Sequence, residues 1–228
     1  MKISFLVPDI ASPVLGPVTV LARNLERHYS VEIIGPDLGQ GVCEMYRGSF
    51  PYVAVQAPKI YRMPDFFRES GRLVRAITGD VIIAVKAYAD TVPLALWEKF
   101  TRGKKVVVYL DEWDGAVLRQ MPFGRRVARV LSSLHHPLDE GYPPLVERLI
   151  RWADDVVSTS TFLQKKFGGR IVHMGVDTDF FKPQAPDASA RLRRELGADG
   201  LKLIAFGGVV RPHKGVDIVP EALARLGD

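Results

Sequence analysis

The chain has 228 residues, of which 47% are apolar and 25% are charged. These fractions are ordinary for a globular protein and exclude wholesale disorder, a collagen helix and a coiled coil. The formal net charge of +5 favours an anionic partner, whether a phosphate group, an anionic lipid or a nucleic acid. A single cysteine, Cys43, excludes an internal disulfide and a multi-cysteine metal site, and it is typical of a reducing compartment.

The amino-terminal residues are predicted to form a core strand. The apolar run at residues 3–7 is interrupted by Pro8 and Asp9, and no small-residue cleavage pattern follows it. No stretch of the chain approaches the roughly 18 apolar residues that a membrane span requires. We therefore expect a cytoplasmic protein.

Short apolar runs alternate with helical patterns along most of the chain. After the first run, Gly16 and Pro17 open a helix whose apolar stripe begins at Val18. Further strands are predicted at residues 31–34, 80–85, 105–109, 155–158, 170–173 and 201–206. Helices are predicted at residues 64–78, 89–101, 117–134, 143–153 and 160–167. This alternation predicts an α/β fold with a doubly wound, Rossmann-like parallel sheet.

The residues that end the predicted strands are the candidate cleft residues, because ligands of such sheets bind beyond the carboxyl ends of the strands. One predicted strand end carries Lys86 and Tyr88, and another carries Tyr109, Asp111 and Glu112. The acidic run at residues 111–114 is compatible with a divalent cation or with capping of the next helix, and we expect no bound metal. The alternative for all of these residues is a structural role at strand ends.

The composition changes at residues 182–187, where two prolines precede a charged helix. Beyond them we expect one strand, one loop and one helix, which are too few residues to bury a core of their own. The predicted organisation is an N-terminal Rossmann-like domain at residues 1–175, a crossover and linker at 176–199, and a truncated start of a second Rossmann-like domain at 200–228.

Common nucleotide and hydrolase signatures are absent. The chain lacks G-x-G-x-x-G after its first strand, G-x-x-x-x-G-K-[ST], and G-x-S-x-G. These absences argue against a nicotinamide or flavin dehydrogenase, a P-loop NTPase and an α/β-hydrolase.

The most informative stretch is the loop at residues 206–217. Gly208 and its neighbour allow a ligand to approach the backbone closely, and the loop opens a helix whose amino end favours anions. Arg211 and Lys214 lie three residues apart, so a planar donor fork and a mobile cation can reach one diphosphate. A solvated basic turn is the alternative.

This loop resembles the donor-binding loop of the retaining glycosyltransferases of family 4, which belong to the GT-B class. The common form of that loop is G-R-x-x-x-x-K-G-x-D, and Gly208, Lys214, Gly215 and Asp217 match it. Val209 stands where the family has arginine, and Arg211 instead fits a variant spacing.

The resemblance extends along most of the chain. Residues 174–183 resemble the crossover segment N-G-V-D-x-x-x-F-x-P, with Met174 at the asparagine position. Residues 156–160 resemble a V-I-x-x-S strand end, and residues 16–25 resemble the first glycine loop and helix. Residues 105–111 are similar to V-V-x-x-x-H-D, except that Leu110 replaces the histidine.

The resemblance implies two facing Rossmann-like domains, one for the acceptor and one for most of the nucleotide sugar. It implies sugar transfer with retention to a glycan or lipid-linked acceptor in polysaccharide biosynthesis, with no cofactor, no required metal and no assigned catalytic side chain. The implied donor diphosphate residues are Gly208, Arg211, Lys214 and Gly16. The implied acceptor or cleft residues are Lys86, Tyr109, Asp111, Glu112 and Asp177.

Two classes of function other than sugar transfer stay open. The family's pair of glutamates further along the chain has no place before Asp228, so we expect no appreciable transferase activity from these residues alone. A non-catalytic carbohydrate- or lipid-binding module with the same fold is one alternative, and a GT-B epimerase or phosphorylase is another. Nucleic-acid binding is disfavoured, because no stripe of interleaved basic and aromatic residues occurs.

The predicted helix at residues 117–134 is basic and amphipathic. It carries Arg119, Arg125, Arg126 and Arg129 beside a set of apolar side chains. Such a helix can lie on an anionic membrane. An ordinary helix with its apolar side in the core is the alternative.

Overall fold

The computed structural model describes residues 1–139, 141–178, 181–183, 185–207 and 214–226. These residues form two compact units, Met1–Asp177 and Thr178–Asp228. No helix in the described part of the chain has both the length and the apolar character needed to cross a membrane.

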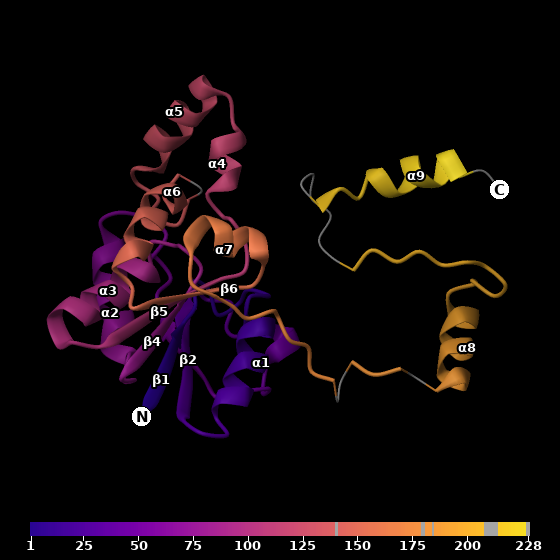
Figure 1. Cartoon of the computed structure of the whole chain (residues 1–228), viewed down its shortest axis with the longest axis horizontal. Coiled ribbons are helices and arrows are strands. Elements are labelled where there is room, and N and C mark those ends of the chain that lie inside the picture. Colours follow the sequence, from indigo (N-terminus) through magenta and orange to yellow (C-terminus); the bar gives the residue numbers. More distant parts are fainter. Residues whose placement is uncertain (140, 179–180, 184, 208–213, 227–228) are drawn as a thin grey trace. The chain divides into compact units, whose positions relative to one another are not determined.

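The first unit is built on a seven-stranded parallel sheet (Figure 1). Its strands are β1 (Lys2–Leu6), β2 (Ser30–Asp37), β3 (Tyr52–Gln56), β4 (Val81–Val85), β5 (Lys105–Leu110), β6 (Asp155–Ser158) and β7 (Arg170–Ile171). They lie in the order β3-β2-β1-β4-β5-β6-β7, and every neighbouring pair is parallel. The predicted doubly wound, Rossmann-like α/β fold is thus confirmed, and the strand order reverses between β1 and β4.

Helices connect the strands. The α-helices of the first unit are α1 (Leu15–Leu25), α2 (Asp65–Ala76), α3 (Val92–Arg102), α4 (Ala116–Gln120), α5 (Phe123–Ser133), α6 (Pro143–Val146) and α7 (Thr161–Phe167). Two 3₁₀ helices, η1 (Glu44–Tyr46) and η2 (Glu147–Trp152), complete the set of elements described in this unit.

Two hydrophobic cores explain why the central strands are apolar almost throughout. Successive side chains of a strand point to opposite faces. Phe5 of β1 therefore belongs to the core that α1 covers, whereas Leu6 belongs to the core that α2, α3, η2 and α7 cover. Both side chains have no exposed surface. Burial on both faces removes the alternation of polar and apolar residues.

Several elements differ from the sequence prediction. The edge strand β3 was not predicted, because most of its side chains are exposed and its pattern is weak. The helix expected at residues 117–134 is split into α4 and α5 at Met121, whose extended conformation is the one favoured before a proline. The helix expected at residues 143–153 continues as the 3₁₀ helix η2 after residue 146.

The second unit contains α8 (Pro186–Glu195) and α9 (Ile218–Leu226) in its described part. The strand predicted at residues 201–206 is wrong, because these residues form no regular secondary structure. Leu201, Leu203, Ile204 and Phe206 are exposed. A strand requires a neighbour for its backbone N–H and C=O groups, and the described residues of this unit provide none.

The amino end of helix α7 is capped by a serine side chain. Ser160 is its N-cap, and the Ser160 Oγ accepts a hydrogen bond from the Leu163 N–H at 3.2 Å. We expect Ser160→Ala to lower the free energy of unfolding by about 1 kcal/mol in urea denaturation, because a backbone donor loses its partner. The control is Thr161→Ala at the exposed first helical position, and an equal loss in both variants would contradict the assignment to the cap.

Candidate functional site

The candidate site lies at the carboxyl ends of β4 and β5, which are adjacent and parallel. Lys86 directly follows β4 and has a φ of 65°, the left-handed region that non-glycine residues rarely adopt. Its backbone N–H donates to the Tyr109 carbonyl at 2.8 Å, and its carbonyl accepts from the Thr91 hydroxyl at 2.8 Å. These contacts hold Lys86 where the loop after β5 can surround its side chain.

Three carboxylates meet the Lys86 ammonium. Its Nζ lies 3.2 Å from Asp111 Oδ1, 2.9 Å from Glu112 Oε2 and 3.4 Å from Asp114 Oδ1. Tyr88 Oη donates to Asp114 Oδ1 at 3.0 Å. Lys86, Asp111 and Asp114 are mostly buried, whereas Glu112 is half exposed. We call Lys86, Tyr88, Asp111, Glu112 and Asp114 the Lys86 cluster.

The charges of this cluster are tightly coupled. Burial lowers the pKa of Lys86, but Asp111, Asp114 and Glu112 outweigh it and raise that pKa above its usual value. Burial, and then the Asp114 carboxylate, raise the pKa of Tyr88. Burial also raises the pKa of Asp114, against the opposing effects of Lys86 and Tyr88. At neutral pH the lysine is therefore charged and the phenol is protonated.

A second group of carboxylates lies near the point where the strand order reverses. Asp90 is completely buried, and neither of its carboxylate oxygens makes a hydrogen bond to another described residue. Burial, and secondarily the charge of Asp9, raise the pKa of Asp90 well above its usual value. Burial likewise raises the pKa of Asp9. In contrast, N–H groups of Gly41 and Gly39 lower the pKa of Asp37.

The structure brings together three of the predicted cleft residues, Lys86, Asp111 and Glu112. Tyr109 lies just below them in β5 as a core residue, and burial, followed by Asp111, raises its pKa to about 12. Asp114 is not in the predicted set, because only the conformation of the loop after β5 brings it to Lys86. Its place in a polar run after a strand was the available signal.

Two other predicted residues lie beside α1. Asp177 Oδ2 pairs with Arg23 Nη1 of this helix at 2.9 Å, and Arg23 also donates to the Ser49 carbonyl. Gly16 is the second residue of α1, and a Cβ at this position would lie 2.5 Å from the Tyr46 hydroxyl. The missing side chain of Gly16 therefore makes room for Tyr46 of η1.

The predicted diphosphate loop is described only in part. Gly208 and Arg211 lie outside the described residues, and Lys214 is an exposed residue of the second unit. The diphosphate site therefore stays a prediction.

The described part of the chain holds no group of three or more His, Cys, Asp or Glu side chains arranged for a metal ion. The carboxylates of Asp111 and Asp114 instead contact Lys86. They do not cap the next helix either, since the N-cap of α4 is Gly115 without a side-chain hydrogen bond. Instead, the Gly115 N–H donates to Glu147 Oε1 at 3.0 Å.

A cavity of about 470 Å³ opens between η2, α7 and the start of β6. Charged side chains of both signs line it, among them Arg148, Arg151, Asp154 and Lys166, and no member of the Lys86 cluster does. We therefore assign it no part in the candidate site.

Comparison with known proteins identifies the fold. No protein-family model and no curated protein match the chain. HepE of Anabaena, solved in complex with UDP and glucose, matches all of this chain and 58% of its own, with a TM-score of 0.63 and 18% identity. Sucrose-phosphate synthase of Thermosynechococcus elongatus matches 85% of this chain and 52% of its own, with a TM-score of 0.53 and 14% identity.

These neighbours are GT-B enzymes. At such low identities the similarity shows the fold alone, and the fold is the Rossmann-like α/β architecture of the GT-B class. The chain spans between half and three-fifths of the length of these two structures.

Proposed function

We propose that this chain is the acceptor-side part, with the beginning of the donor side, of a retaining glycosyltransferase related to family 4. The enzyme would transfer a sugar from a nucleotide sugar to a glycan or lipid-linked acceptor. The observation that carries the proposal is the Lys86 cluster at the carboxyl edge of a GT-B sheet. The fold supports the class, and the sequence resemblance supports the family and retention.

The chemistry of the cluster suits an acceptor rich in hydroxyl groups. Asp111, Glu112 and Asp114 provide carboxylate oxygens that accept hydrogen bonds from sugar hydroxyls. Lys86 supplies one positive charge against these three acids. The net negative charge of the cluster opposes a phosphate group at this edge. The cluster is therefore the proposed acceptor side, and Asp177 is a proposed contact at the end of the same unit.

The donor side is proposed to begin in the second unit. Lys214, Gly208, Arg211 and Gly16 are the residues proposed to hold the diphosphate of the nucleotide sugar. Cationic donors stabilise the charge that develops on a leaving diphosphate, and they do so more strongly in the transition state than in the ground state. The proposal requires no metal ion or other cofactor.

The test follows the backbone amide signals of the 228-residue chain by NMR during titration with disaccharides that end in glucose, galactose or mannose. At least one sugar is expected to bind weakly and to shift signals at residues 86–90 and 111–115. Glu112→Gln should weaken this binding about three- to tenfold, because one charge-assisted hydrogen bond is lost. Glu112 is suitable because its side chain is half exposed, and circular dichroism should show that the variant keeps the wild-type fold.

The matched control is Glu26→Gln. Glu26 is an exposed acid at the carboxyl end of α1, and the chain after it enters β2 at the opposite edge of the sheet. The Glu26→Gln variant should leave sugar binding unchanged. Equal sugar affinity in the Glu112→Gln and wild-type chains, or signal shifts confined to residues outside the cluster, would contradict the proposed acceptor site.

A further inference from the structure

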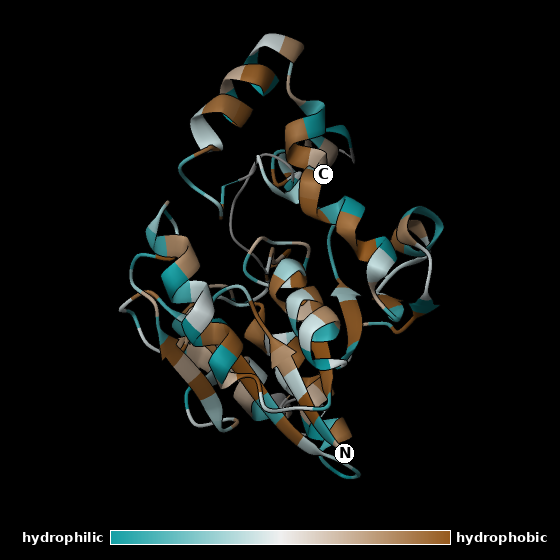
Figure 2. Cartoon of the chain, turned by 90° about the vertical axis from the view of Figure 1, so that its left-hand side faces the viewer, coloured by the Kyte–Doolittle hydropathy of each residue, from teal (hydrophilic) through white to brown (hydrophobic). Residues whose placement is uncertain are grey.

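The cavity between η2, α7 and the start of β6 has the dimensions of a small-molecule site. Its volume of about 470 Å³ lies within the usual range for such sites. Ile150 and Val156 are its buried apolar lining residues, and Figure 2 shows that the strands of the sheet are mostly hydrophobic. Gly169 has a φ of 79°, and a Cβ there would collide with the Val156 carbonyl oxygen. Glycine therefore lets the chain after α7 close one side of the cavity.

Two arginines of η2 line this cavity. Arg148 and Arg151 are three residues apart, and side chains with this spacing lie on the same face of a 3₁₀ helix. The Arg151 guanidinium lies over the Trp152 ring, 4.9 Å from its centroid. Neither guanidinium forms a hydrogen bond or an ion pair with another described residue. Two planar donor forks are therefore available on one wall of the cavity.

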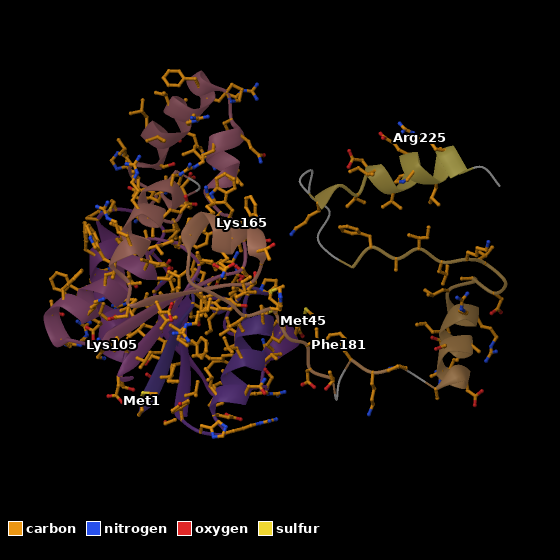
Figure 3. The ribbon with its side chains drawn as sticks, viewed as in Figure 1. Met1, Met45, Lys105, Lys165, Phe181 and Arg225 are labelled. Carbon is orange, nitrogen blue, oxygen red and sulfur yellow. The ribbon has the colours of Figure 1, made fainter. Side chains whose placement is uncertain are left out.

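A third cation lines the cavity from α7. Lys166 lies near the end of this helix, and its Nζ is 3.8 Å from the centroid of the Trp113 ring. Figure 3 labels its neighbour Lys165 on the same helix. Lys166 forms no ion pair with another described residue. Positive charge thus comes from both helices that form the cavity.

The acidic side chains that line the cavity are neutralised by cations that do not line it. These ion pairs are Glu147–Arg119 at 3.3 Å, Asp154–Lys99 at 3.0 Å, Asp154–Lys105 at 3.2 Å and Asp155–Arg170 at 3.1 Å. The charges of Arg148, Arg151 and Lys166 are therefore not cancelled by the acids beside them. A concave surface with a surplus of positive charge attracts anions.

We propose that this cavity binds a small phosphate ester, with Arg148 and Arg151 holding the phosphate and the apolar residues contacting the organic part. A phosphate monoester carries about 1.5 to 2 negative charges at pH 7 and has three strong acceptor oxygens. It can therefore engage two guanidinium forks, whereas a carboxylate carries a single charge. The inference is independent of the proposed function, since no member of the Lys86 cluster lines the cavity.

The test is a titration of the 228-residue chain with glucose 6-phosphate at constant ionic strength, followed by NMR of the backbone amides. Binding is expected with a Kd near or below about 1 mM, and signals should shift at residues 147–156 and 166–169. Glucuronate, a carboxylate of similar size, should bind at least about tenfold more weakly. Arg148→Gln and Arg151→Gln should each weaken glucose 6-phosphate binding about five- to tenfold, because charge-assisted hydrogen bonds are lost.

The matched control is Arg75→Gln. Arg75 is an exposed arginine of α2 that likewise forms no hydrogen bond or ion pair with another described residue, and it lies outside the cavity. This variant should bind glucose 6-phosphate as the wild type does, and circular dichroism should show every variant folded. Wild-type affinity in the Arg148 and Arg151 variants, signal shifts confined to residues outside the cavity, or equal affinity for glucuronate would overturn the proposal. Equal weakening by Arg75→Gln would also overturn it, because the binding would then be a general attraction to a basic protein.

Discussion

Replacing Lys86 by methionine is expected to lower the free energy of unfolding by about 3–5 kcal/mol. The substitution keeps most of the length of the side chain and removes its charge. Asp111, Glu112 and Asp114 then lose their common cation, and two of these acids are nearly buried. A buried charge without a partner destabilises the fold far more than a surface ion pair stabilises it. Urea denaturation followed by circular dichroism measures the difference in free energy of unfolding between the variant and the wild type.

Two controls separate this charge effect from packing. Lys86→Arg retains the positive charge and should recover most of the stability. Arg191→Met removes the cation of the Arg191–Glu195 pair, which is as short as 2.8 Å but exposed on both sides. That change should cost no more than about 0.5 kcal/mol. A similar loss in Lys86→Met and Arg191→Met would show that burial of the cluster does not determine its energetics.

The pH dependence of Lys86→Met has a definite sign. Burial already raises the pKa of Asp114, and the charge of Lys86 opposes this rise, so removing the cation raises that pKa further above its unfolded value. A raised carboxyl pKa contributes stability at low pH that is lost as the pH rises through the folded-state value. The deficit of the variant should therefore be largest at neutral pH and shrink in mild acid, and adding Asp114→Asn should restore part of it.

The strands of the sheet could be predicted from the sequence because the apolar runs that form them are the same residues that the fold buries. β1, β4 and β5 are buried on both faces, so their apolar runs identify them without knowledge of the fold. The rule that ligand residues follow such strands then led to Lys86, Asp111 and Glu112. The same rule led to Tyr88, whereas the contacts of Asp114 with Lys86 and Tyr88 required the loop conformation itself.

The orientation of α5 shows where sequence reasoning ends. Its periodicity predicted an amphipathic helix, and a core-facing apolar side was the ordinary alternative. The side of α5 that faces the protein is its polar side, and it is determined by Asp139, which binds Ser133 and Arg129. Asp139 lies six residues after Ser133 and ten residues after Arg129. No periodicity within the helix contains that information. For the same reason the mostly apolar run at residues 201–206 predicts a strand, although its conformation depends on neighbours that it lacks among the described residues.

Replacing Asp90 by asparagine is expected to raise the free energy of unfolding at neutral pH by about 1–3 kcal/mol. The Asp90 carboxyl is completely buried, and neither of its oxygens bonds to another described residue. In the wild type this group must either bind a proton or remain charged without a partner. Asparagine has the same shape and is neutral at every pH, so the variant avoids both costs.

The pH profile distinguishes this explanation from a change in packing. The folded-state pKa of Asp90 is raised, so its contribution to stability is present below the unfolded value, about 3.9. That contribution is lost as the pH rises through the folded value. The gain from Asp90→Asn should therefore disappear in acid and grow towards neutral pH in a series of urea titrations. A variant less stable than the wild type at neutral pH would instead reveal a cationic or hydrogen-bonding partner for Asp90.

Asp37→Asn provides a control of opposite sign at the same edge of the sheet. The Gly39 and Gly41 N–H groups donate to Asp37 Oδ1 at 2.8 and 2.9 Å, and they lower its pKa. Its stabilising effect is thus present above the unfolded pKa and lost as the pH falls through the folded value. Asp37→Asn should cost about 1–2 kcal/mol at neutral pH and little in acid. Two buried aspartates would then respond to the same substitution with opposite signs, because N–H groups of other described residues donate to the Asp37 carboxylate and not to that of Asp90.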